Sequence, residues 1–273
     1  MKRLWHDKSL FLASVTLICV VLLVLVGPLL APWSYEVVDW NAVNAPPSAD
    51  HWFGTDGAGR DLFARTLVGG QVSLGIAILA TCVSFAIGVP WGAIAGYVGG
   101  RTDQLMMRVV DGMYSVPFIL VVILLVVLVG RNAYLLFVGI GAVSWLDISR
   151  IVRGQTLVVR TGQFVQAARG LGASRPWIVW RHILPNVVGI AFVYATLTIP
   201  GVIIAESFIS FLGLGIQEPQ TSWGVLVSDG TKEMHSSPWQ LAFPAAFLVI
   251  TLVCVNVIGD KFRDAITVSS IRR

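Results

Sequence analysis

The sequence predicts an all-α protein, a polytopic membrane bundle of six transmembrane helices with both chain ends in the cytoplasm. Of its 273 residues, 56% are hydrophobic and 12% are charged, whereas about a quarter of the residues of a soluble domain are charged. The apolar residues form long blocks separated by short charged stretches, and most basic residues lie in alternate connections between the blocks. This pattern excludes a soluble enzyme, a disordered chain and a secreted disulfide scaffold.

The spans follow from the uncharged blocks, because about 20 apolar residues are needed to cross the hydrocarbon core. The first block is too long for a signal peptide and no small-residue cleavage site follows it, so we expect a retained helix. The fourth is short and ends on Asp147. The expected helices lie near residues 10–31, 72–98, 112–130, 133–149, 188–212 and 241–260.

The distribution of Lys and Arg predicts the orientation, since cytoplasmic loops carry an excess of both. One set of alternate loops holds 15 of the 19 basic residues, including the loop 150–186 with six arginines. This set contains both ends of the chain, which agrees with an even number of spans. The net charge of +4 is therefore an orientation signal, and we expect contact with membrane lipid and no nucleic-acid partner.

The chain divides into three parts. Residues 1–70 are expected to hold the first transmembrane helix and an external segment. Residues 71–265 form a core with five spans and a cytoplasmic loop near 161–186, and residues 266–273 form a cytoplasmic tail. The external stretches 33–66 and 213–240 are long enough to offer a docking surface.

The sequence shows no catalytic or cofactor motif. No Gly-Lys pair occurs, which excludes a phosphate-binding P-loop, and the histidines and cysteines have no metal-ligand spacing. We expect no catalytic, cofactor-binding or metal residues in this chain.

Two features inside the spans are candidate sites. Glu206 is an acid within an apolar block, where ionisable groups usually have a function. It is interpreted either as a proton or substrate site or as a residue that lines the pathway or bonds a neighbouring helix. Gly88, Gly92 and Gly96, followed by Gly100, recur every four residues and predict close packing of a neighbouring helix on one face.

The loop 150–186 predicts a helix-turn-helix under the membrane. Phe164, Ala167, Ala168 and Leu171 recur at helical spacing and form an apolar stripe, and Gly170 and Gly172 end the helix in a turn. Ser174 is the expected cap of a second helix that continues to Pro185. An apolar face in a cytoplasmic loop needs a partner, either the protein's own helix ends or another subunit.

This loop resembles the EAA signature of ABC importer permeases through Gln166-Ala167-Ala168, Gly172 and Ile183-Leu184-Pro185. Further stretches resemble the C-type permeases of the dipeptide, oligopeptide and nickel importer group, and the resemblance spans roughly residues 10 to 265. These stretches include Gly54-Thr55-Asp56, Gly59-Arg60-Asp61, Arg150-Ile151-Val152-Arg153-Gly154, Ser222-Trp223-Gly224 and Gly259-Asp260.

The resemblance implies the fold of a type I ABC importer permease in a bacterial inner membrane. It implies a heterodimer with a second homologous permease, one or two cytoplasmic subunits that bind ATP and magnesium, and an extracytoplasmic substrate-binding protein. The implied substrates are di- or oligopeptides. The resemblance assigns the ATPase-coupling element to Gln166, Ala167, Ala168, Gly172, Ile183, Leu184 and Pro185.

One departure and several alternatives accompany the resemblance. Gln166 stands where the signature has Glu, so an ion pair with the ATPase is replaced by a weaker neutral hydrogen bond. The substrate alternatives within the group are nickel and glutathione. Outside the group, the alternatives are a proton-coupled secondary transporter that uses Glu206, for which no internal repeat is evident, and a gated channel.

Overall fold

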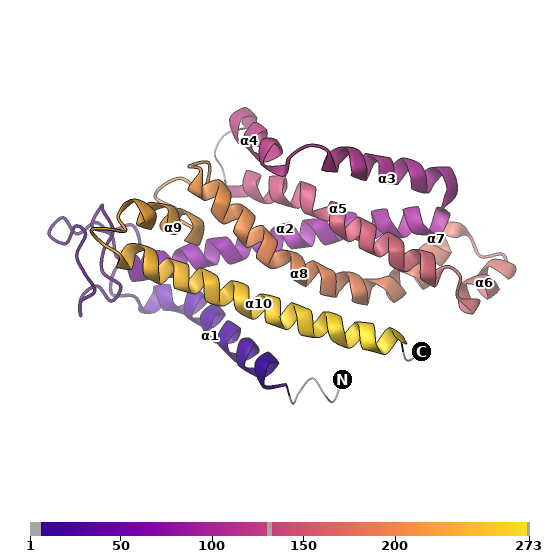
Figure 1. Cartoon of the computed structure of the whole chain (residues 1–273), viewed down its shortest axis with the longest axis horizontal. Coiled ribbons are helices and arrows are strands. Elements are labelled where there is room, and N and C mark those ends of the chain that lie inside the picture. Colours follow the sequence, from indigo (N-terminus) through magenta and orange to yellow (C-terminus); the bar gives the residue numbers. More distant parts are fainter. Residues whose placement is uncertain (1–6, 130–132, 272–273) are drawn as a thin grey trace.

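The computed structural model describes residues 7–129 and 133–271, which form an elongated bundle of helices (Figure 1). Extended pairing within these residues is limited to two isolated bridges in the segment that precedes the second long helix. The predicted all-helical class is confirmed. The basic residues Lys2, Arg3, Arg131, Arg272 and Arg273 that support the orientation lie outside the described residues, as does Gly130 at the end of the third expected span.

Four of the expected spans coincide with long apolar helices. These are α1 (Lys8–Leu30), α2 (Leu62–Val98), α8 (Leu184–Phe211) and α10 (Trp239–Ile271). Each lies in a helical stretch that is long and apolar enough to cross a membrane. Their interiors contain proline at positions 28, 90, 200 and 244, which transmembrane helices tolerate.

The third expected span, 112–130, is wrong as a single helix. Helix α3 (Gly100–Tyr114) ends at the third residue of this stretch, and the apolar α4 (Phe118–Val129) begins after a three-residue break. Pro117 lies in this break and disfavours helical backbone at the residue before it. With 12 residues, α4 has a length of only about 18 Å.

The fourth expected span, 133–149, is longer than its apolar block. Helix α5 (Ala133–Val159) continues past Asp147 for three more turns and takes up residues expected in the cytoplasmic loop. Arg153 on this extension makes a two-pronged ion pair with Asp103 of α3, with N–O distances of 2.5 and 2.7 Å. Such charge-assisted pairs are the strong ones among hydrogen bonds, and this one joins α3 to α5.

The predicted close packing on the glycine face of α2 is found against α5. A Cβ atom at Gly88 would lie 2.8 Å from the carbonyl oxygen of Trp145, and one at Gly96 would lie 2.7 Å from Cβ of Thr156. A Cβ at Gly92 would overlap the carbonyl of Ser149. Gly100 does not belong to this face, because it lies beyond the end of α2, has a φ of +58° and has open space around it.

The short helices lie at the two ends of the bundle (Figure 1). Helix α9 (Trp223–Lys232) and the segment 31–61 form one end, and α6 (Gln163–Gly170) and α7 (Arg175–Ile178) form the other. The two described chain ends approach each other, since Asp7 caps α1 and its carboxylate also pairs with Nζ of Lys261 on α10 at 2.5 Å.

Candidate functional site

Helix α6 forms where the apolar stripe predicted it, but a different face is buried. Val165 and Ala168 are buried, whereas Phe164, Ala167 and Leu171 are exposed. Of the four stripe residues, therefore, only Ala168 faces the protein. Of the two partners expected for the stripe, the protein's own helices therefore cover only Ala168, because helical spacing identifies residues that share a side without saying which side packs.

The turn after α6 depends on the backbone of Gly172. This residue has a φ of +81°, and the N–H of Ala173 bonds to the carbonyl of Ala168 at 3.1 Å. A glycine in the left-handed region with this bond is a common helix ending. A Cβ at Gly172 would meet no atom within 4 Å. Glycine is therefore required here by the left-handed backbone conformation and not by a lack of space for a side chain. The predicted turn is confirmed.

The second helix does not end at Pro185 as expected. Helix α7 passes through a π-helical turn (Val179–Ile183) directly into α8, and Pro185 lies in the first turn of α8. In the π turn the N–H of Leu184 bonds back to Val179, and Pro185 has no N–H that would need a partner. Ser174 precedes α7 as expected but makes no capping hydrogen bond with its side chain.

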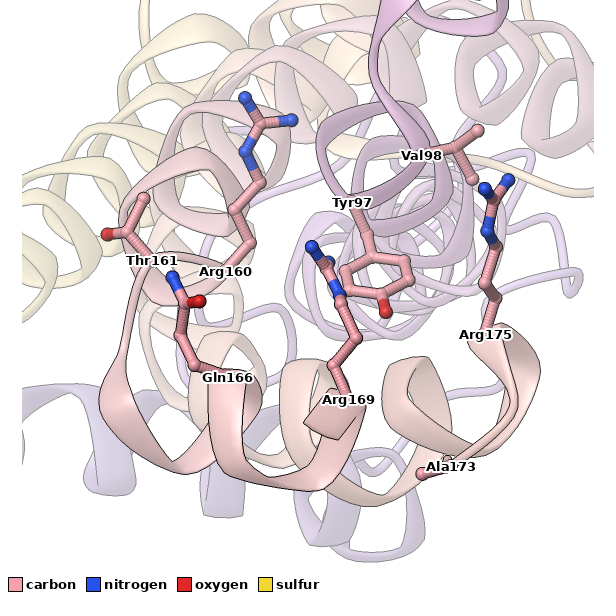
Figure 2. Close-up of a pocket in the computed structure, with 8 residues that line it drawn as sticks. All are labelled: Tyr97, Val98, Arg160, Thr161, Gln166, Arg169, Ala173 and Arg175. Carbon is pink, nitrogen blue, oxygen red and sulfur yellow. The ribbon is translucent and has the colours of Figure 1, made fainter. Parts of the chain in front are cut away.

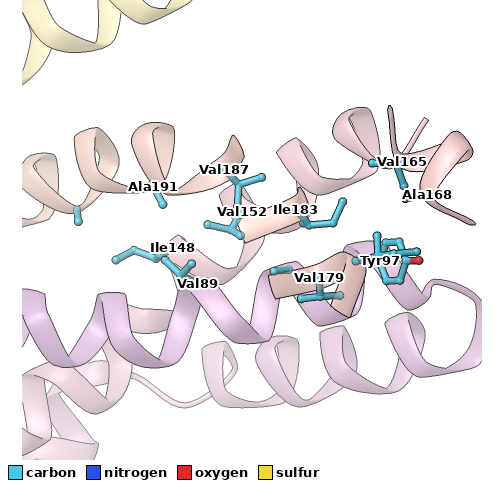
Figure 3. Close-up of a cluster of buried hydrophobic side chains, with 13 residues drawn as sticks. Val89, Tyr97, Ile148, Val152, Val165, Ala168, Val179, Ile183, Val187 and Ala191 are labelled. Carbon is cyan, nitrogen blue, oxygen red and sulfur yellow. The ribbon is translucent and has the colours of Figure 1, made fainter. Parts of the chain in front are cut away.

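The inner face of this element packs into the bundle (Figure 3). Val165 and Ala168 of α6 and Ile178 and Ile183 of the second helix join one buried cluster with residues of α2, α5 and α8. Fully burying a side chain such as Ile178 stabilises the fold by about 1.5–3 kcal/mol. The predicted coupling residues Ala168 and Ile183 therefore anchor the element. Leu184 is half-buried against the same cluster.

The outer face of the element carries large apolar side chains that the rest of this chain leaves exposed. Leu171 is 89% exposed and Trp180 is 72% exposed, and Phe164 and Trp177 are about half exposed. The ring of His182 lies between the last two, with centroid distances of 5.9 Å to Phe164 and 5.1 Å to Trp177. We call Phe164, Ala167, Leu171, Trp177 and Trp180 the coupling surface.

Beside the coupling surface lies a cationic pocket of about 570 Å³ that includes Gln166 (Figure 2). The guanidinium of Arg169 lies 5.5 Å from the centre of the Tyr97 ring. Arg160 donates to the carbonyl oxygen of Gly96 at 2.9 Å, and Arg175 lies on the opposite side of the pocket. The lining contains no carboxylate, so the side chain at position 166 faces positive charge.

Glu206 is fully buried and bonded to three hydroxyl groups. Ser222 donates to its carboxylate at 2.6 Å, Ser210 at 2.8 Å and Ser73 at 3.2 Å. Ser73 belongs to α2, and Ser222 is the residue that caps α9. The carboxylate therefore ties α2, α8 and α9 together, which favours the helix-bonding interpretation over a proton site.

At the opposite end the structure shows a charge network that sequence reasoning missed. Arg60 pairs with Asp56 at 2.8 Å and with Glu218 at 2.6 Å, and this second pair joins positions 158 residues apart. The ring of His51 bonds to the carboxylate of Asp61 at 2.8 Å, and Asp61 also caps α2. The pair between Arg60 and Glu218 connects segments distant in sequence, so no local pattern signals it.

Among the described residues, no group of three His, Cys, Asp or Glu side chains is arranged to hold a metal ion. Besides the serines bonded to Glu206, Ser9 and Ser236 donate to the carboxylates of Asp7 and Glu233, which lie two and three residues away on the same chain segment. The described residues thus provide three candidate functional features: the exposed coupling surface, the cationic pocket beside it, and the buried carboxylate of Glu206 that links three helices.

Two family models match the chain. The model described as "Binding-protein-dependent transport system inner membrane component" matches residues 88–268, and "N-terminal TM domain of oligopeptide transport permease C" matches residues 1–47. The first match alone covers about two thirds of the chain and includes every residue of the coupling surface.

Several curated relatives are similar over nearly the whole chain. The oligopeptide transport system permease protein OppC of Haemophilus influenzae is 49% identical over 97% of this chain and 86% of its own length. OppC of Escherichia coli strain K12 is 47% identical over 97% of this chain and 88% of its own length. The dipeptide transport system permease protein DppC of Bacillus subtilis is 43% identical over 97% of this chain and 83% of its own length.

Solved structures support the fold. The inward-facing methionine ABC transporter MetNI has a chain with a TM-score of 0.60 and 20% identity, covering 73% of this chain and 95% of that chain. An amino acid ABC transporter has a chain with a TM-score of 0.55 and 13% identity, and the match covers 73% of this chain and 93% of that chain. The chain therefore belongs to the binding-protein-dependent transport system inner-membrane components, the multi-pass, non-catalytic permease subunits of ABC transporters.

Proposed function

We propose that this chain forms half of the translocation pathway of an ATP-driven importer of oligopeptides or dipeptides. A second homologous permease forms the other half. One or two cytoplasmic subunits bind and hydrolyse ATP with magnesium, and an extracytoplasmic binding protein delivers the peptide. The observation that carries this proposal is an exposed apolar surface on an element that continues into a span without a break.

The coupling surface has the properties of a docking site for an ATPase subunit. Its inner side is fixed in the bundle by Val165, Ile178 and Ile183, while its outer side exposes Leu171 and Trp180 to solvent. Exposed large apolar groups next to charged ones are typical of interaction surfaces. Because α7 continues through the π turn into α8, a push on this surface moves α8 directly.

The basic surroundings favour an acidic partner. The stretch 150–186 contains six arginines and no Asp or Glu, and Gln166 lines the pocket between Arg160, Arg169 and Arg175. Complementary charge speeds association and fixes the orientation of partners. Arg150 and Arg153 pair with aspartates of α3 in the same chain. The lining of the pocket, with Gln166 in place of Glu, contains no carboxylate to offset its arginines.

The proposed topology has six spans and both chain ends in the cytoplasm. Besides the four long apolar helices, α4 and α5 supply the remaining two crossings, with α3 leading to the shorter α4. The pair between Asp7 and Lys261 holds the start of α1 beside α10, in agreement with ends on one side. The division into 1–70, 71–265 and 266–273 stays a prediction.

The substrate proposal is supported by the relatives. Their names state oligopeptide or dipeptide transport, which favours peptides over the alternatives nickel and glutathione. For a proton-coupled carrier, Glu206 would have to exchange protons, but it is buried among three hydroxyl donors.

The test uses Leu171→Asp in the complete transporter, reconstituted in vesicles with its second permease, ATPase subunits and binding protein. Leu171 packs on nothing that its loss would disturb, so we expect normal insertion and thermal stability. Placing a carboxylate on the apolar docking surface should lower ATPase association and peptide uptake at least tenfold, since each 1.4 kcal/mol of lost binding is a factor of about ten.

Phe262→Asp is the matched control, because Phe262 is a half-exposed apolar residue on α10 at the same end of the bundle. It should leave association and uptake unchanged. Normal ATPase association and uptake by the Leu171→Asp transporter would refute the coupling surface. Uptake driven by a proton gradient without any ATPase would refute the proposed function as a whole.

A further inference from the structure

An acidic side chain is exposed halfway along a span. Asp147 lies in α5, 12 residues before its end at Val159, and its side chain is exposed on the surface of this chain. A carboxylate that faces lipid at this depth is very unfavourable, so such a residue faces water, a neighbouring subunit or a ligand.

Asp147 opens onto a hollow of about 380 Å³ between α5, α8 and the bend that joins α3 to α4. Thr198 of α8 and Tyr114 of α3 lie in the same wall, each 14 residues from the start of its helix, Leu184 and Gly100. At 1.5 Å per residue these three side chains lie about 20 Å from the helix ends nearest the coupling surface. The hollow is therefore at mid-membrane depth. Its lining is otherwise mostly apolar, from Phe118, Ile140, Val143, Leu197, Val202 and Ala205.

The break between α3 and α4 lies beside the same hollow. Tyr114 ends α3 and Phe118 begins α4, and both line it. Non-helical backbone at membrane depth is tolerated where it lines a water-filled cavity or is buried in protein. The break and the exposed acid thus indicate independently that this face is not covered by lipid.

The carboxylate of Asp147 is only partly used within the chain. Among the residues that the structure describes, the hydroxyl of Tyr114 is its hydrogen-bond donor. The nearby Arg150 pairs instead with Asp111 at 2.6 Å, with its guanidinium 4.2 Å from the centre of the Tyr114 ring. A carboxylate accepts about four hydrogen bonds, so Asp147 retains acceptor sites toward the hollow.

We propose that the hollow is a substrate site in the translocation pathway and that Asp147 accepts hydrogen bonds from the α-ammonium group of the peptide. This inference rests on the proposed function and extends it to a specific residue. Small apolar side chains of the peptide fit the apolar lining, and the amino terminus of the peptide binds Asp147, the carboxylate among the described lining residues. Gly201 and Thr198 on α8 leave room and a hydroxyl at the same level.

The test measures peptide binding to the assembled transporter in lipid nanodiscs without its binding protein. The probes are trialanine with a free amino group and N-acetyl-trialanine. We expect the wild type to bind the free peptide at least tenfold more tightly, because a hydrogen bond to a charged group is typically strong enough for this ratio. Asp147→Asn should bring the ratio close to one, and Asp147→Glu should largely restore it.

Asp229→Asn serves as the control, since it removes a carboxylate that pairs with Lys232 at the other end of the protein, and it should keep the wild-type ratio. A second measurement labels Thr198→Cys, with the three native cysteines replaced by serine. A membrane-impermeant thiol reagent should react with it, and free trialanine should slow that reaction.

Three results would overturn the inference. The first is an unchanged affinity ratio between free and acetylated trialanine in Asp147→Asn, and the second is equal affinity of the wild type for both peptides. The third is failure of Asp147→Asn to assemble with the second permease, which would assign the carboxylate to the subunit interface. ATP-dependent peptide uptake by the wild-type transporter, reconstituted in sealed vesicles with its binding protein, would leave the proposed function intact in each case. If the wild type imports no peptide at all, the proposed function itself fails.

Discussion

The two ends of the bundle use their charged residues differently. At the end formed by α9 and the segment 31–61, Arg60 pairs with Asp56 and Glu218. At the opposite end the arginines after α5 meet a backbone carbonyl and an aromatic ring, as Arg160 and Arg169 do. Among the described residues no ion pair reaches Arg160, Arg169, Arg175 or Arg181.

The apolar residues of the two ends differ in the same way. Trp223 at the α9 end is fully buried and its indole N–H bonds to the carbonyl of Thr66 at 2.9 Å, whereas Trp180 and Leu171 at the other end are mostly exposed. At the α9 end the arginine Arg60 and the tryptophan Trp223 find their partners within this chain, although Trp40 there is exposed. The end with α6 has charges and apolar groups that only a partner can satisfy, and this is why coupling to a separate ATPase belongs there.

Trp223→Ala should produce the largest loss of stability. Truncating a buried tryptophan typically costs about 3–5 kcal/mol, and this one also leaves the Thr66 carbonyl without its donor. We expect the melting temperature of the purified subunit in detergent to fall by roughly 10 °C. Fluorescence-monitored thermal unfolding measures this directly.

The comparison between the ends provides two controls. Trp40→Ala removes a tryptophan that is 81% exposed at the same end, and Trp180→Ala removes one from the coupling surface. Both should change the free energy of unfolding by about 0.5 kcal/mol or less, as surface substitutions usually do. Trp180→Ala should nevertheless weaken ATPase association. If it destabilised the isolated subunit as much as Trp223→Ala, the contrast between the ends would be wrong.

Glu206→Ala comes next, with an expected loss of about 3 kcal/mol. It leaves the hydroxyls of Ser73, Ser210 and Ser222 without their acceptor in a buried site, and unsatisfied buried groups cost about 1–3 kcal/mol each. Glu206→Gln keeps one acceptor oxygen and should be less destabilising. Its ATP-dependent uptake separates the two interpretations: uptake near the wild-type rate supports a tie between helices, and complete loss in a stable protein supports a proton or substrate site.

Gly172→Ala should have a smaller and local effect of about 1–2 kcal/mol, because an L-residue in the left-handed region costs that much. Since the space around Gly172 is open, even Gly172→Trp acts first through the backbone. The matched control is Gly170→Ala, which lies in ordinary helix with open space and should be neutral or slightly stabilising. Limited trypsin cleavage at Arg169 reports the opening of the turn. Equal cleavage of both variants would contradict the role of the φ of Gly172.

Much of the fold is predictable from the sequence, because span positions depend on local composition. The helices α1, α2, α8 and α10 form where apolar blocks exceed the bilayer thickness. The break before α4 is not visible to hydropathy, since Pro117 interrupts an otherwise suitable block. Hydropathy also places the end of the fourth span at Asp147, because the charge interrupts the apolar block, although α5 continues to Val159.

The coupling element is only partly predictable. Its helix, its turn at Gly172 and its exposed apolar side chains follow from spacing and from the conformational freedom of glycine. The choice of Val165 as the inner residue depends on contacts with Tyr97 and Ile178, which are distant in sequence. The continuous helix through Pro185 depends on a π turn that no sequence pattern signals.

The smallest expected effect is a pH dependence at the α9 end. A hydrogen bond from Arg60 holds the pKa of Glu218 below its ordinary value of 4.5. A lowered pKa in the folded state means that the pair stabilises the protein above pH 4.5 and that this contribution is lost as the pH falls through the lowered pKa. Because the Glu218 side chain is 60% exposed, solvent screening keeps the effect small.

Glu218→Gln isolates this contribution. The variant should melt slightly below the wild type at pH 7. The difference should shrink as the pH falls from 4.5 through the lowered pKa of Glu218, below which the wild-type carboxyl is also neutral. Glu233→Gln, which removes an acid that accepts only from the neighbouring Ser236, should show no comparable convergence. A difference that stays constant down to pH 3 would mean that Glu218 contributes through packing rather than charge. The charge of the ion pair between Arg60 and Glu218 would then contribute nothing to the stability of the α9 end.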